Sequence, residues 1–129
     1  MTKYIITAKE LLDNINDFII LDCRAELGNP GWGNKEYLKE HISGSYFVNG
    51  ETDLSDPVSE HGGRHPMPDL EKLRVYFEIS GISNSSKVAA HGLYSGRAVF
   101  ILRLFGIEAS LIGGTFEFLR SLGFPVDAK

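Results

Sequence analysis

The chain has 129 residues, of which 43% are hydrophobic and 23% charged, proportions that suit one globular domain over residues 1–129. The formal net charge of −4 gives no electrostatic reason to expect nucleic acid or an acidic membrane as a partner. No apolar run approaches the roughly 20 residues of a membrane-spanning helix, and the first seven residues lack the apolar core of a signal peptide. The single cysteine rules out an internal disulfide, and we expect a cytoplasmic location.

The first part of the chain alternates helix and strand. A capping residue, followed by Glu three positions later, predicts a helix over residues 7–13. The continuous apolar run at 18–21 is typical of a strand covered on both faces. A short helix is expected over 34–41, with Tyr37 and Leu38 turned inward, and a strand over 45–48.

The second part repeats this alternation after a polar segment. Residues 49–67, rich in Gly, Ser, Asp, Pro and His, predict a surface loop. The amphipathic helix predicted over 68–79 places Leu70, Leu73 and Phe77 on one face. The elements expected after it are a strand at 88–91, a helix at 97–105, a strand at 109–112 and a helix at 115–122.

Strands and helices that alternate at short intervals indicate an α/β fold. We predict a central parallel sheet of about five strands with helices on both faces. Ligands of such sheets bind beyond the carboxyl ends of the strands. Cys23, Gly92 and Gly113 each follow a predicted strand, so all three are expected at that edge.

The segment between the strand at 88–91 and the next helix has the features of an anion cradle. A tight glycine-bounded loop before a helix directs backbone N–H groups at one point. The residues of this loop are Gly92, Leu93, Tyr94, Ser95, Gly96 and Arg97. Ser95, Gly96 and Arg97 are the candidate anion-binding residues, although Arg97 has a second interpretation as the partner of a carboxylate such as Asp22. The loop holds no cysteine.

Four segments, in order and at the right spacing, resemble the rhodanese family, the sulfurtransferase module, over about residues 7–126. They are FIILDCRAE (18–26), EYLKEHISGS (36–45), the strand, loop and helix of 88–106, and LIGGTFEF (111–118) followed by GFPV (123–126). Glu40 and Phe118 stand where the family usually has Gly and Trp. The resemblance implies a rhodanese-like α/β fold. It also implies a catalytic cysteine at the position of Gly92, or of His91 if the alignment slips by one residue, and neither can carry a persulfide.

The long loop and the residues after it resemble the first domain of two-domain sulfurtransferases, which usually lacks the cysteine. The resemblance therefore favours an inactive homologue: a non-catalytic, regulatory module of sulfur metabolism that binds a small anion or a protein partner. The alternative is an atypical sulfurtransferase, of the thiosulfate or mercaptopyruvate type, that uses Cys23 or a partner's cysteine. Whether the chain is an enzyme stays open at this point, and no cofactor is expected.

The remaining candidate residues each have an ordinary structural interpretation. Cys23 ends a buried strand and is expected to be an apolar filler; as an acceptor of sulfur it would need a lowered pKa, for example from Arg24. His91 is either an interior histidine or a charge beside a bound anion. His41 is expected to be structural. His61 and His65 are four residues apart, but Gly and Pro break any helix there, so no metal site is predicted.

Overall fold

The computed structural model describes residues 4–49, 70–79, 81–83 and 85–128. Within them, five strands form one sheet in the order β1-β6-β5-β2-β4, and every neighbouring pair is parallel. The strands are β1 (Ile5–Ile6), β2 (Ile19–Asp22), β4 (Tyr46–Phe47), β5 (Lys87–His91) and β6 (Glu108–Ile112). The predicted five-stranded parallel sheet is confirmed.

The register of the central strands decides which residues meet at the functional edge. In the pairing of β2 with β5, Asp22 lies opposite His91, and β4 places Phe47 opposite Asp22 on the other side. The strands β2 and β5 therefore end at the same level. Because parallel strands carry their carboxyl ends to one edge, the residues that follow each of them lie close together.

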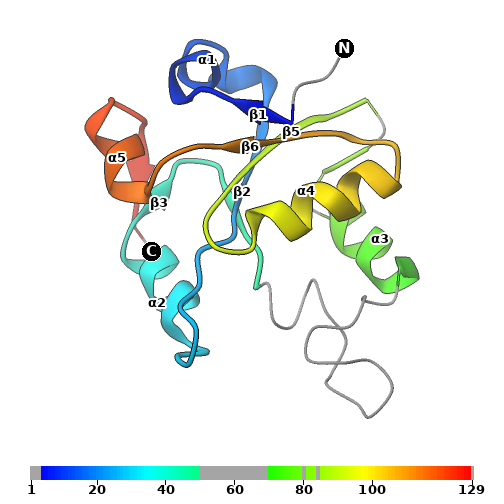
Figure 1. Ribbon diagram of the computed structural model, residues 1–129, viewed down its shortest axis with the longest axis horizontal. Coiled ribbons are helices and arrows are strands. Elements are labelled where there is room, and N and C mark those ends of the chain that lie inside the picture. The colour runs from blue at the N-terminus through cyan, green and yellow to red at the C-terminus, as the bar shows by residue number, and fades with distance from the viewer. Residues whose placement is uncertain (1–3, 50–69, 80, 84, 129) are drawn as a thin grey trace.

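Helices cover both faces of the sheet, as predicted (Figure 1). The helices α3 (Leu70–Ile79) and α4 (Ser95–Leu104) pack on one face, and α1 (Ala8–Asp13) and α5 (Phe116–Ser121) on the other. Each face has its own hydrophobic cluster: one includes Phe77, Ile101 and Leu102, the other Leu11 and Leu119. Burial on both faces explains why the central strands read as continuous apolar runs.

Local sequence signals set the ends of two helices. The Thr7 hydroxyl accepts a hydrogen bond from the Glu10 N–H at 3.0 Å before α1, and the Thr115 hydroxyl accepts one from the Phe118 N–H at 3.1 Å before α5. Each satisfies an N–H group that the helix leaves without an intrahelical partner. The capping predicted at residue 7 is confirmed.

Other elements differ from the prediction. The helix α2 (Trp32–Lys39) ends earlier than expected, because His41 begins the short strand β3 (His41–Ile42). This strand pairs antiparallel with β7 (Val126–Asp127), and a 3-10 turn, η1 (Ile15–Asp17), precedes β2. Elements of two or three residues have no readable period, so the pattern missed them. Leu38 is 44% exposed, so the prediction that it turns inward is wrong.

Some predictions fall on parts of the chain that the structure does not describe. These are the loop from residue 50 to 67, with His61 and His65, and the side chains of Leu70 and Leu73. Phe77, the third apolar position of that helix, is buried as expected. Among the described residues, no helix is long and apolar enough to cross a membrane.

Candidate functional site

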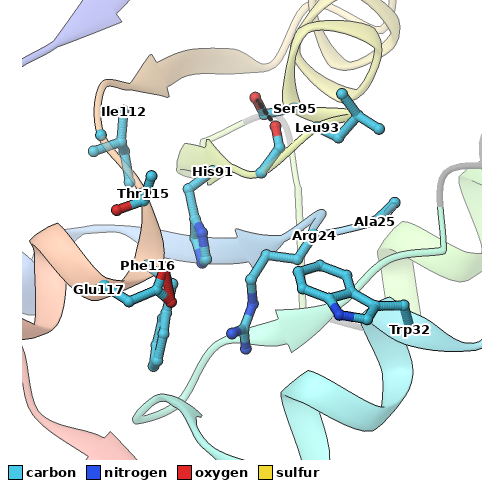
Figure 2. Close-up of a pocket in the computed structure, with 12 residues that line it drawn as sticks. Arg24, Ala25, Trp32, His91, Leu93, Ser95, Ile112, Thr115, Phe116 and Glu117 are labelled. Atoms are coloured by element: carbon cyan, nitrogen blue, oxygen red, sulfur yellow. Dashed lines mark hydrogen bonds between the residues drawn. The ribbon is translucent and has the colours of Figure 1, made fainter. Parts of the chain in front are cut away.

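A cavity of about 410 Å³ opens at the carboxyl edge of the sheet (Figure 2). Its walls come from the segments that follow β2, β5 and β6 and from the start of α2. The lining residues are Arg24, Ala25, Trp32, His91, Gly92, Leu93, Ser95, Ile112, Gly114, Thr115, Phe116 and Glu117. This is the edge at which the fold class places ligands.

Arg24 is the cationic residue of this cavity, and it is held in a rigid position. Its Nε donates to both oxygens of Asp22 at 3.1 Å, and its Nη2 donates to Oδ2 at 2.9 Å. The same Nη2 donates to the Glu40 carbonyl at 2.8 Å, and the guanidinium lies over the Phe116 ring, 4.1 Å from its centroid. Asp22 is fully buried and Arg24 is 8% exposed. The bidentate geometry of this pair offsets the cost of burying both charges.

His91 is the buried titratable group beside this pair. It is 1% exposed, and neither ring nitrogen has a hydrogen-bond partner among the described residues. Its Nε2 lies 3.8 Å from Asp22 Oδ2, too far for a hydrogen bond. Burial lowers the pKa of His91; Asp22 opposes this shift and Arg24 adds to it. The imidazole is therefore neutral at pH 7.

The two positions that sequence reasoning left open for the absent cysteine are distinguished by their backbone geometry. Gly92 has a φ of +102°, and a Cβ built there would lie 2.4 Å from Arg24 N and 2.5 Å from the carbonyl carbon of Cys23. Backbone atoms thus fill the space that any side chain at position 92 would need. Of the two positions, only His91 brings a side chain to the cavity wall, as Figure 2 shows.

The loop after β5 is shorter than predicted. The helix α4 begins at Ser95, not at Arg97, so only Gly92, Leu93 and Tyr94 lie outside regular structure. The Tyr94 N–H donates to the Cys23 carbonyl at 3.2 Å, and the Ser95 N–H donates to the Gly92 carbonyl at 3.1 Å. The Ser95 hydroxyl donates to the same carbonyl at 2.7 Å. Backbone carbonyls therefore accept two of the N–H groups that were predicted to converge on one point, those of Tyr94 and Ser95.

The three candidate anion-binding residues occupy the first turn of α4. Ser95 lines the cavity, whereas exposed Gly96 and half-buried Arg97 are not among the lining residues. The carboxylate of Asp22, named as an example of a carboxylate partner in the second interpretation of Arg97, accepts hydrogen bonds from Arg24. Anion binding at this turn stays a prediction.

Cys23 does not face the cavity. It is fully buried and belongs to the hydrophobic cluster under α3 and α4. Its N–H donates to the His91 carbonyl at 2.8 Å. Side chains alternate along a strand, so Cys23 points away from the Asp22–Arg24 pair. The positive charge of Arg24 therefore lies on the opposite face of the sheet from the Cys23 thiol. Gly113 lies at the edge as predicted, exposed after β6.

The other candidate histidine has a structural role. His41 is buried, and its Nδ1 lies 2.7 Å from the Tyr37 carbonyl. Its ring stacks on that of Tyr37 at a centroid distance of 3.8 Å. His61 and His65 lie outside the described residues, and the described part of the chain holds no cluster of metal-ligating side chains.

Sequence reasoning missed most of the cavity wall, including Trp32, Thr115, Phe116 and Glu117. Trp32 reaches the cavity because α2 starts close to the backbone of Arg24. A Cβ at the neighbouring residue, Gly33, would lie only 2.1 Å from the Arg24 carbonyl oxygen. Thr115 could have been predicted at the edge of the sheet, because it is a helix-capping residue that follows two glycines. Trp32 is a single aromatic residue among polar ones, and no local pattern indicates that it lines a cavity.

The fold is that of the rhodanese-like proteins. The 3-mercaptopyruvate sulfurtransferase from Leishmania major shares it with a TM-score of 0.90 at 24% identity, over 98% of this chain and 36% of that protein. The crystal structure of SseA from Escherichia coli, described as a 3-mercaptopyruvate sulfotransferase with the rhodanese fold, has a TM-score of 0.75 at 27% identity. That match covers 98% of this chain and 52% of SseA.

Sequence relatives agree with the structural ones. The chain is 34% identical over 109 residues to a 3-mercaptopyruvate sulfurtransferase of Pseudomonas aeruginosa, and this match covers 79% of the chain and 38% of the relative. It is 32% identical over 133 residues to the thiosulfate sulfurtransferase SseB of Mycobacterium tuberculosis, and this match covers 97% of the chain and 46% of SseB. No protein-family model matches the chain. The chain is a rhodanese-like domain related to sulfurtransferases, and it spans less than half the length of these curated relatives.

Proposed function

We propose that this chain is a non-catalytic binding domain of the rhodanese-like class, with its ligand in the cavity at the carboxyl edge of the sheet. The observation that carries the proposal is the position of the one sulfur nucleophile. Sulfur transfer by a cysteine needs an accessible thiolate in an electropositive site. Here the only thiol is fully buried in the core, and backbone atoms exclude a side chain from position 92.

The competing function is sulfur transfer through Cys23 or through a cysteine that a partner supplies. The names of the relatives suggest thiosulfate and 3-mercaptopyruvate as the donors to test. We expect the purified chain to release no sulfur from either donor to cyanide above the uncatalysed rate. We also expect Cys23→Ala to leave that background unchanged.

Two comparisons make this test decisive. Cys23→Ala retains a small apolar side chain in the core, whereas Cys23→Ser places a hydroxyl there, so a folding defect would appear mainly in the serine variant. Turnover by the parent that is lost in well-folded Cys23→Ala would establish Cys23 as the acceptor and refute the proposal. Turnover that appears only with a cysteine-bearing partner protein would support the partner-cysteine alternative.

A further inference from the structure

The lining of the cavity has no uncompensated positive charge before any ligand binds. Arg24 is neutralised by Asp22, to which its guanidinium donates three hydrogen bonds. The other charged residue among the lining residues is Glu117, which is exposed at the rim. His91 is neutral, because burial lowers its pKa. A bound anion would therefore add negative charge to a site that has no uncompensated cation, so the charges favour an uncharged ligand.

The cavity nevertheless has hydrogen-bonding groups that lack partners. Both nitrogens of His91 are buried without a hydrogen bond among the described residues. The hydrogen bonds that Arg24 makes to described residues use its backbone N, Nε and Nη2, and Nη1 is not one of the buried atoms without a partner. An unsatisfied buried polar atom costs about 1–3 kcal/mol, so a ligand that forms a hydrogen bond with a His91 nitrogen gains that energy.

The walls between these groups are largely apolar and aromatic. Ile112 and Phe116 are buried, Trp32 is half-buried and Leu93 is exposed at the opening. Figure 2 shows the rings of Trp32 and Phe116 on either side of the Arg24 side chain, with His91 above them. Mostly apolar walls with a few polar groups are typical of sites for small organic molecules.

We infer that the cavity binds a small uncharged molecule that joins an aromatic or similarly flat apolar body to a planar amide-like group. The amide oxygen accepts a hydrogen bond from Arg24 Nη1, and the amide N–H donates to the unprotonated nitrogen of His91. The apolar body packs against Trp32 and Phe116. This inference rests on the proposed binding function and names the class of ligand that the site takes.

Benzamide and benzoate make a matched pair of probes, because they have the same size and shape but differ in charge and in the N–H donor. We would titrate each into the isotopically labelled chain at pH 7.5 and follow the amide signals of residues 91–95 and 112–117 and the indole signal of Trp32. Benzamide is expected to bind at least about tenfold more tightly than benzoate, the ratio that one hydrogen bond with a net value near 1.4 kcal/mol gives. Sulfate tests the competing prediction that the first turn of α4 binds an anion, and it is expected to leave these signals unmoved.

The variant His91→Phe tests the polar contact, since it retains an aromatic ring and removes both nitrogens. It is expected to weaken benzamide binding about tenfold and to leave the weaker benzoate binding nearly unchanged. His41→Phe is the matched control: it makes the same change at a buried histidine that does not line the cavity, and it should bind benzamide as the parent does. Both variants must first give the parent's circular dichroism spectrum; if His91→Phe does not, His91→Leu, which also lacks a hydrogen-bonding side chain, replaces it.

Three outcomes would overturn the inference: benzoate or sulfate binding as tightly as benzamide, benzamide binding that is the same in His91→Phe, or no shift with any probe. Sulfur transfer measured on the same samples separates the two proposals. Absent transfer together with absent benzamide binding would refute only the ligand class. Transfer that depends on Cys23 would refute the non-catalytic function.

Discussion

Replacing Gly92 with cysteine, the residue that its place in the loop motif suggests, is expected to destabilise the domain without creating an accessible thiol. The cause is the path of the neighbouring strand. A Cβ at position 92 would lie 2.4 Å from Arg24 N and 2.7 Å from the Cys23 carbonyl oxygen. Both are backbone atoms, and the Cys23 N–H donates a hydrogen bond to the His91 carbonyl. The backbone of residues 23 and 24 therefore cannot move without breaking the pairing of the sheet at this edge.

The size of the effect follows from two terms. A side chain at a φ of +102° costs about 1–2 kcal/mol, as for other residues with a left-handed backbone. Forcing the backbone apart to make room adds about 1–3 kcal/mol, the usual cost of overpacking. The sum of about 2–5 kcal/mol corresponds to a Tm lower by about 8–20 °C, at about 4 °C per kcal/mol for a domain of this size.

Thermal unfolding followed by circular dichroism measures this loss, and a thiol reagent reports the accessible cysteines. Gly96→Ala is the matched control, because a Cβ at Gly96 meets no atom within 4 Å; its Tm should equal or exceed that of the parent, since alanine is the better helix former. His91→Cys should place a thiol at the cavity wall that reacts with the reagent. A Gly92→Cys protein as stable as the parent, with a reactive second thiol, would show that the backbone argument is wrong.

Two further predictions concern the buried groups beside the cavity. Asp22→Asn is expected to lower the free energy of unfolding in urea by about 3–5 kcal/mol, because it leaves the buried Arg24 without its counter-charge; a loss below about 1 kcal/mol would mean that the pair contributes little. Burial lowers the pKa of His91 from 6.5. Below pH 6.5, therefore, His91 takes up a proton in the unfolded chain while it stays unprotonated in the folded one. This contribution to stability is complete above pH 6.5 and is lost as the pH falls below it. His91→Phe should reduce that loss between pH 7 and 5, and an unchanged profile would contradict the assignment.

Much of the fold was readable in the sequence, because the relevant signals are local. The apolar run at 18–21 and the alternation of strand and helix predicted a parallel sheet covered on both faces, and the structure has it. The cap at Thr7 was readable too, since its hydroxyl and the Glu10 N–H are three residues apart. The order of four motifs identified the fold class. The two-residue strands β3 and β7 were missed because their pairing joins residues about 85 positions apart, which no window of sequence contains.

The site depended on tertiary structure, because its groups meet only when three separate segments end at one edge. The alternation of side chains along a strand would have separated Cys23 from Asp22 and Arg24, but nothing local showed that Asp22 pairs with Arg24. From the sequence, Gly92 was interpreted as a glycine that replaces the catalytic cysteine. In the fold it is a position where the backbone of residues 23 and 24 passes too close for any side chain, and that distance between remote segments is set by packing alone.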